Sequence, residues 1–264
     1  GLGGVEVRVV GRPGHGVTRT AADGRFFMVV NAGPAVVLEL RAAGWLPSQR
    51  TLVVPRHQFT WAGRVVLVTG ASRGLGYAAA KNAASRGAHV IAVARTVGGL
   101  EDLDDDIQAL GSSTTLVPMD LTDGEAIDRL GAAIFERWGQ LDGLIGNAGA
   151  LGVLSPLPHI APKDFANVFA VNVEANYRLI RSLDLLLRQS DAGRAVFISS
   201  GAALSAKPYW GLYAASKAAL DAMVKSYAGE MAITEVKANI FYPGQVRTAM
   251  RAKAMPGEDP KTLP

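Results

Sequence analysis

The sequence has no cysteine among its 264 residues. This absence excludes disulfides, thiolate catalysis and cysteine-ligated metal sites, although it does not decide the redox compartment. No apolar run approaches the roughly 18 residues that a membrane-spanning helix needs, and the first residues do not have the pattern of a secretory leader. We therefore expect a soluble, cytoplasmic protein without a membrane partner.

The chain also has only a small excess of positive over negative residues. The formal net charge is +4, and the arginines and lysines are scattered along the chain. Scattered basic residues argue against a nucleic-acid partner, because such a surface needs them clustered. His15 and His57 stand alone in loop-like surroundings and are expected at the surface, so no metal site is predicted.

Residues 1–58 differ in composition from the rest of the chain. Short β-rich runs alternate with Gly, Pro, Asn and Asp, which predicts a small all-β unit. The turn residues at 20–26, 31–33 and 44–47 resemble those of carboxypeptidase-regulatory-like β-sandwiches, which occur as accessory modules. The expected strands cover 5–10, 25–30, 35–41 and 51–54.

Residues 61–264 alternate between apolar strand-like runs and amphipathic helical segments. About half of the whole chain is apolar, which is enough for a sizeable core. Regular alternation of this kind predicts an α/β fold, a doubly wound parallel sheet with right-handed crossovers. The expected strands cover 65–68, 89–94, 115–119, 141–146, 195–199 and 236–241, and the expected helices cover 75–86, 100–110, 124–138, 163–189 and 211–233.

A glycine-rich turn follows the first of these strands, in the sequence VVLVTGASRGLG at 65–76. We expect Gly70 to let the chain leave the strand sharply, Gly74 to let the backbone approach a pyrophosphate, and Gly76 to let the helix pack closely. The free N–H groups at the helix start would then face an anion. The spacing is not the common Gly-x-Gly-x-x-Gly, and a strand, turn and helix without a ligand explains the turn equally well.

Two arginines bear on which anion is bound. The second strand ends at Ala94-Arg95, where a carboxylate would bind a ribose 2′-hydroxyl and an arginine would accept a 2′-phosphate. Arg73 in the glycine turn offers a second guanidinium. Together they favour NADP over NAD, the alternative being that both are merely solvated.

The fifth strand ends at Ser200, and the helix after it carries Tyr213 and Lys217. Residues four apart lie on one face of a helix. A free tyrosine titrates near pH 10, and a neighbouring ammonium is expected to lower that pKa by stabilising the phenolate. The trio is therefore a candidate acid–base site.

With these residues in view, 61–264 resembles a short-chain dehydrogenase/reductase of the single-domain Rossmann type. The match rests on the order and separation of several motifs, including Asn172 and Pro243-Gly244. The resemblance implies that Tyr213 donates the proton, Ser200 holds the substrate oxygen, and Lys217 lowers the tyrosine pKa and binds the nicotinamide ribose. It implies that Asn172 holds a water of the proton relay, unless that asparagine only satisfies backbone groups.

The resemblance also implies a cofactor site, an assembly and a reaction. Hydride would pass between NADP(H) and a carbonyl or secondary alcohol, in a homodimer or homotetramer formed through 163–189 and 211–233. The apolar stretches 151–159 and 204–212 are expected to line a pocket for a hydrophobic small molecule. The expected cofactor-binding residues are Thr69, Gly70, Ser72, Arg73, Gly74, Leu75, Gly76, Arg95, Asp120, Leu121, Asn147, Ala148, Gly149, Tyr213, Lys217, Pro243, Gly244, Val246 and Thr248.

Two departures from the family pattern leave alternatives open. Gly146 stands where the family often has an asparagine, which is a mild change. The chain stops at Pro264, where family members continue to a seventh strand, so 236–241 is expected to be an exposed sheet edge. A catalytically weak nucleotide-binding or assembly module is the alternative function, and a Rossmann methyltransferase would not explain Ser200, Tyr213 and Lys217.

Overall fold

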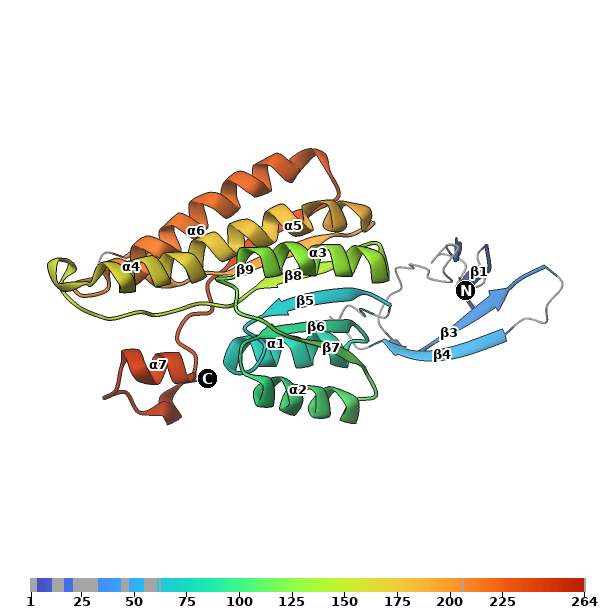
Figure 1. The fold of residues 1–264 in the computed structure, drawn as a ribbon. Coiled ribbons are helices and arrows are strands. Elements are labelled where there is room, and N and C mark those ends of the chain that lie inside the picture. Colours follow the sequence, from blue (N-terminus) through green and yellow to red (C-terminus); the bar gives the residue numbers. More distant parts are fainter. Residues whose placement is uncertain are drawn as a thin grey trace. The chain divides into compact units, whose positions relative to one another are not determined.

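The computed structural model describes residues 4–10, 17–20, 33–43, 48–54, 61, 63–205 and 207–263. The contacts divide the chain into two compact units, Gly1–Gly63 and Arg64–Pro264 (Figure 1). Each unit has its own sheet, so each is described by itself.

The N-terminal unit contains a four-stranded antiparallel sheet in the order β2-β1-β3-β4. Val5, Val7 and Leu38 are its buried apolar side chains. Three of the predicted strands are present; β2 was not predicted, and the run expected at 25–30 lies outside the described residues. The strands are β1 (Glu6–Val9), β2 (Val17–Arg19), β3 (Gly33–Arg41) and β4 (Ser48–Val54).

The second unit is built on a six-stranded sheet in the order β10-β9-β8-β5-β6-β7, and every pairing is parallel. The order reverses between β5 and β8, which makes the sheet doubly wound, as predicted. All six expected strands are present, within two residues of the predicted bounds. They are β5 (Val65–Thr69), β6 (His89–Ala94), β7 (Thr114–Pro118), β8 (Gly143–Gly146), β9 (Arg194–Ile198) and β10 (Lys237–Phe241).

Helices cover the two faces of this sheet unequally. Figure 1 shows α1 and α2 on one face and α3, α5 and α6 on the other. The larger hydrophobic core lies under the second group, between β5, β8 and β9 and the helices. The helices are α1 (Gly74–Ser85), α2 (Val97–Ala109), α3 (Gly124–Trp138), α4 (Pro162–Phe169), α5 (Ala175–Gln189), α6 (Gly211–Glu230) and α7 (Ala249–Ala254).

The helix predicted at 163–189 is interrupted by a π-helical turn, Ala170–Glu174, between α4 and α5. The helix predicted at 211–233 ends as an α-helix at Glu230 and continues as a 3₁₀ turn, Met231–Ile233. The short α7 was not predicted. By contrast, α3 has its predicted bounds, and the Asp123 side chain caps it by accepting from the Ala126 N–H at 3.0 Å.

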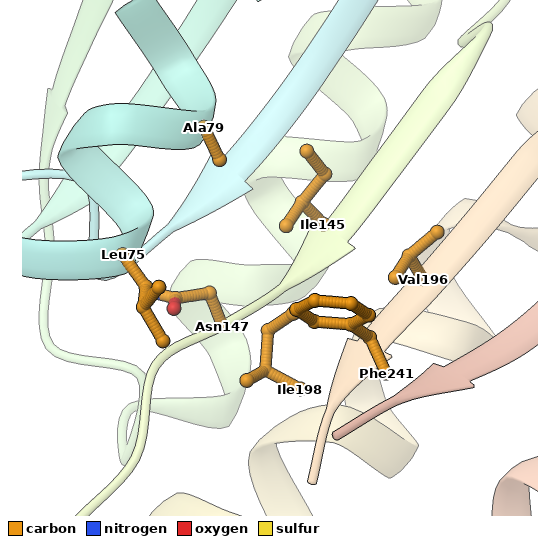
Figure 2. A pocket seen from close by; sticks show the side chains of 7 residues that line it. All are labelled: Leu75, Ala79, Ile145, Asn147, Val196, Ile198 and Phe241. Carbon is orange, nitrogen blue, oxygen red and sulfur yellow. The ribbon is translucent and has the colours of Figure 1, made fainter. Parts of the chain in front are cut away.

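The sheet is left partly uncovered where β8, β9 and β10 face the side of α1. An apolar pocket with a volume of about 220 Å³ lies there. Figure 2 shows the side chains that line it. β10 forms the edge of the sheet, as predicted for 236–241, and Phe241 is 51% exposed. The pocket is lined by Leu75, Ala79, Ile145, Asn147, Val196, Ile198 and Phe241.

The described residues contain neither a membrane-spanning helix nor a cluster of metal-ligating side chains. None of the helices there is long and apolar enough to cross a membrane. In the same part of the chain, no group of three or more His, Asp or Glu side chains could hold a metal ion.

Candidate active site

The glycine turn between β5 and α1 has the backbone that its sequence predicts. Gly70 and Gly74 have φ values of +65° and +60°, which side chains disfavour. A Cβ on Gly76 would lie 2.3 Å from the Gly70 carbonyl oxygen and 2.4 Å from Asn147 Nδ2. The expected close approach is therefore present, and its partners are the turn itself and the end of β8.

Thr69 and Asn147 tie the ends of β5 and β8 together. The Thr69 hydroxyl accepts hydrogen bonds from the backbone N–H groups of Asn147 at 2.9 Å and Ala148 at 3.0 Å. Asn147 Nδ2 donates to the Thr69 carbonyl at 2.8 Å. Both side chains are occupied within the protein, so we expect them to shape the site rather than to bind a ligand directly.

The start of α1 and the end of β6 carry exposed cations. Arg73 occupies the N-cap position of α1, and the first turn of that helix holds no acidic residue, which favours an anion there. Arg95 is 71% exposed, and its Nη1 lies 3.7 Å from Asp120 Oδ2. The backbone N–H of Thr122 holds the pKa of Asp120 below its usual value, so this carboxylate competes with any anion for Arg95.

Three other predicted cofactor residues differ in accessibility. Leu121 belongs to the hydrophobic core and is only 8% exposed, so its side chain is not available to a ligand. Ser72 is half-buried in the turn, like Leu75 at the start of α1. The sequence placed Leu121 correctly at the strand end but could not show that it points inward.

Tyr213 lies in the first turn of α6 and is 7% exposed. Burial raises the pKa of Tyr213, and a hydrogen bond with the Ser200 side chain opposes that shift. The sequence analysis expected Lys217 to lower this pKa. In the structure the pKa is raised instead, because burial outweighs the stabilisation of the phenolate.

Lys217 is almost completely buried beneath Tyr213. Its Nζ donates to the Ile198 carbonyl at 2.7 Å and lies 6.0 Å from the centroid of the Tyr213 ring. Burial lowers the pKa of Lys217 to about 8, against an opposing effect of Asp221. The ammonium is therefore still the main form at pH 7, at a distance from the tyrosine that fits an indirect electrostatic role.

Asn172 occupies the π-helical turn and is fully buried. Its Oδ1 accepts from the Ala150 N–H at 2.7 Å, while its Nδ2 donates to the Ala150 carbonyl at 2.9 Å and to Ser216 Oγ at 2.9 Å. The side chain is thus fully used in fixing the loop after β8. π-turns inside α-helices are frequent at functional sites, and a water relay would have to use the Asn172 backbone.

The segment after β10 reaches back to the glycine turn. Thr248 Cγ2 lies 3.6 Å from the position that a Cβ would take on Gly74. The Thr248 hydroxyl accepts from the Arg251 N–H at 3.2 Å and so caps α7. Gly244 turns the chain with a φ of +72°, and Pro243 and Val246 are half-buried in the same segment.

One pair near the site, between the buried Asp221 and the exposed Tyr242, was not predicted. Asp221 follows Lys217 by one helical turn, and its carboxylate accepts a hydrogen bond from the Tyr242 hydroxyl. The i, i+4 spacing from Lys217 is the only sign of Asp221 in the sequence. Tyr242 cannot be paired with it until α6 is known to pack on β10.

A family model described as short chain dehydrogenase matches residues 64–259. The chain belongs to this family. A second model, the Teneurin TTR-like domain, matches residues 1–67, whereas the predicted carboxypeptidase-regulatory-like module is not shown.

Similar proteins extend this result. The oxidoreductase YciK of Escherichia coli (strain K12) is 38% identical over 76% of this chain and 80% of its own length. A short chain dehydrogenase structure from Shigella flexneri 2a strain 301, complexed with NADP, has a TM-score of 0.74 at 38% identity and matches 76% of this chain and 85% of that one. A structure from Escherichia coli CFT073, complexed with NADPH, gives the same values.

Proposed function

We propose that the chain is an oxidoreductase that transfers a hydride between NADP(H) and a carbonyl or secondary alcohol. The observation that carries this proposal is the cluster of Ser200, Tyr213 and Lys217 at the carboxyl ends of the strands, beside a glycine turn in the same sheet. Membership of the short chain dehydrogenase family supports it, as do the relatives solved with NADP and NADPH. These findings favour the oxidoreductase over an inactive binding module.

The residues around the glycine turn fit a nicotinamide dinucleotide. The exposed backbone of Gly74 leaves room for a pyrophosphate at the start of α1. A Cβ on Gly149 would lie 3.4 Å from Asn172 Oδ1 and 3.5 Å from Lys217 Nζ, so the glycine keeps the space between these two groups clear. The exposed guanidinium groups of Arg73 and Arg95 suit the additional phosphate of NADP.

When bound, the nicotinamide supplies or accepts the hydride. Tyr213 is protonated at neutral pH, because burial raises its pKa. It can therefore donate its phenolic proton to the substrate oxygen during reduction. Ser200 holds that oxygen by a second hydrogen bond, and Lys217 contributes a buried positive charge as negative charge develops on the oxygen.

The loops over this site favour an apolar substrate. Val153, Leu157, Leu204 and Tyr209 are all exposed and lie on the loops that follow β8 and β9. The Tyr209 carbonyl accepts from the Ser155 N–H at 3.1 Å, which joins the two loops. We therefore expect a hydrophobic carbonyl compound to be preferred over a charged one.

The test is a spectrophotometric assay of NADPH and NADH oxidation with a panel of aromatic, aliphatic and charged carbonyl compounds. Turnover should be highest with NADPH and an apolar ketone or aldehyde. Tight NADPH binding by calorimetry, together with no turnover across the panel in either direction, would instead support the binding module.

Two further proposals concern the whole chain. Residues 1–58 would be an accessory module, and 61–264 the catalytic domain. The outer faces of α4, α5 and α6 would form the contact of a homodimer or homotetramer. Sedimentation of the full chain, compared with a chain carrying Leu185→Glu on the exposed face of α5, tests the assembly.

A further inference from the structure

Three buried side chains follow one another along α6 at intervals of four residues. They are Tyr213, Lys217 and Asp221, which are 7%, 3% and 4% exposed. Side chains at this spacing lie on one face of the helix. The first two are accounted for by the proposed chemistry, whereas Asp221 is a buried acid with no role in it.

Asp221 is held from the other side by the end of β10. The Tyr242 hydroxyl donates to Asp221 Oδ2 at 2.6 Å. The other oxygen, Oδ1, is buried and has no hydrogen-bond partner among the described residues. This bond is the main reason that the pKa of Tyr242 is raised. A charged carboxylate with a free buried oxygen is costly, so a nearby cation is expected to compensate it.

The elements around Lys217 offer no other compensating charge. Its Nζ bonds the neutral Ile198 carbonyl at the end of β9. Tyr213 on α6, the Asn172 side chain in the π-turn and the Tyr242 phenol after β10 are neutral at pH 7. Among the described residues, no carboxylate lies within 4.0 Å of this ammonium, and Asp221 is the acid whose charge acts on it.

We propose that Asp221, oriented by Tyr242, is a positioning residue that supplies the counter-charge for the buried Lys217 ammonium. The inference rests on the proposed function for its catalytic meaning. Among the described residues, the Asp221 carboxylate bonds Tyr242 and makes no hydrogen bond with Tyr213. It acts through Lys217, by favouring the protonated form in a place where burial disfavours it.

A second tyrosine–aspartate pair, between Tyr227 on α6 and Asp184 on α5, provides a matched control. The Tyr227 hydroxyl donates to Asp184 Oδ1 at 2.9 Å, and Asp184 also accepts from Arg188 at 2.8 Å. Asp184→Asn therefore weakens the same kind of bond to the same helix and removes the same charge. It does so three turns away from Lys217.

The first experiment is the pH dependence of kcat/KM for carbonyl reduction. Removing the negative charge of Asp221 lowers the pKa of Lys217, because the ammonium loses its stabilisation. Asp221→Asn should move the alkaline limb of the profile toward lower pH by about one unit. Asp221→Glu should restore the wild-type limb, and Asp184→Asn should leave it in place. The proposal would be overturned if Asp221→Asn lowered kcat/KM at every pH but left the alkaline limb of the profile at its wild-type pH.

The second experiment does not need activity. Lysine side chains labelled with ¹³C at Cε report their protonation by NMR, and the Lys217 signal is assigned by its absence in Lys217→Arg. In the folded full chain, the Lys217 midpoint should fall in Asp221→Asn and stay near 8 in Asp184→Asn. An unchanged midpoint would refute the counter-charge. A shifted midpoint in a chain without turnover would refute the proposed function alone.

Discussion

The parallel sheet carries a buried ionic cluster at each of its two ends, and the two clusters are built differently. At the amino ends of the strands, Asp142 is 1% exposed and accepts from Arg64 Nη1 at 2.7 Å, from Ser190 Oγ at 2.7 Å and from the Val65 N–H at 2.8 Å. At the carboxyl ends, Lys217 donates to the Ile198 carbonyl, and no carboxylate of the described residues forms an ion pair with it.

The difference between the two clusters indicates that one stabilises the fold and the other takes part in the chemistry. A carboxylate whose oxygens are both hydrogen-bonded within the protein is held in one geometry. A buried ammonium without a contacting partner has a lowered pKa and stores unfavourable energy that a developing negative charge can relieve. The amino-end cluster is therefore expected to control stability, and the carboxyl-end cluster activity.

The largest effect is expected from Tyr213→Phe. This change removes the proton donor and leaves the ring in place, so kcat/KM should fall by about 10³-fold or more, within the range of general acid catalysis. Cofactor affinity, measured by calorimetry, should change little. Tyr227→Phe is the matched control, because it removes a buried phenol from the same helix away from the site. Equal losses in both variants would contradict the assignment.

The residues at the carboxyl ends of the strands could be predicted from the sequence, because apolar runs show where each strand ends. β6 and α3 have their predicted bounds, since a continuous apolar run defines the strand and a capping residue, predicted at Thr122 or Asp123 and observed at Asp123, begins the helix. Ser200 follows from the same rule, whereas Tyr213 was found through its i, i+4 spacing from Lys217. The pKa of Tyr213 could not be predicted, because it depends on how deeply α6 buries the phenol.

The next largest effect is expected at the opposite end of the sheet. Asp142→Ala removes the shared acceptor and leaves Arg64 and the Val65 N–H without it, so the free energy of unfolding should fall by about 3 kcal/mol. Urea denaturation measures this, and kcat per folded molecule should be unchanged. Asp191→Ala, which removes an acid that is 61% exposed from the same cluster, should cost less than about 1 kcal/mol.

Lys217→Met should have the opposite effect on stability when it is made in the Asp221→Asn chain, where no buried carboxylate is left without its cation. Burial lowers the Lys217 pKa to about 8 in the folded chain, whereas an unfolded lysine titrates near 10.4. The unfolded chain therefore binds the extra proton between these values, and the charge destabilises the fold below pH 8. The variant should gain about 1–2 kcal/mol at pH 7 while losing activity, and the gain should shrink as the pH rises toward 10.4. A loss of stability at pH 7 would contradict this.

Other contacts of the site could not be found in the sequence, because they join segments that are distant along the chain. Asn172 interrupts an apparently regular helix to bond Ala150, 22 residues earlier. Tyr242 reaches Asp221 across the packing of α6 on β10. Neither pairing has a period or a spacing that would indicate it, whereas the i, i+4 relation of Tyr213 and Lys217 does.

The smallest effect concerns an exposed ion pair at the carboxyl ends, which contrasts with the buried Arg64–Asp142 pair. Arg95 and Asp120 are 3.7 Å apart and largely exposed, so their pairing contributes little to stability. Arg95→Ala should leave the unfolding free energy nearly unchanged. It should raise the KM for NADPH about tenfold, because a guanidinium–phosphate contact is lost and Asp120 then repels the phosphate. The KM for NADH should stay the same, and Arg86→Ala, at the far end of α1, should change neither value. Equal changes for the two cofactors would place Arg95 outside the phosphate site and leave Arg73 as the remaining cation for it.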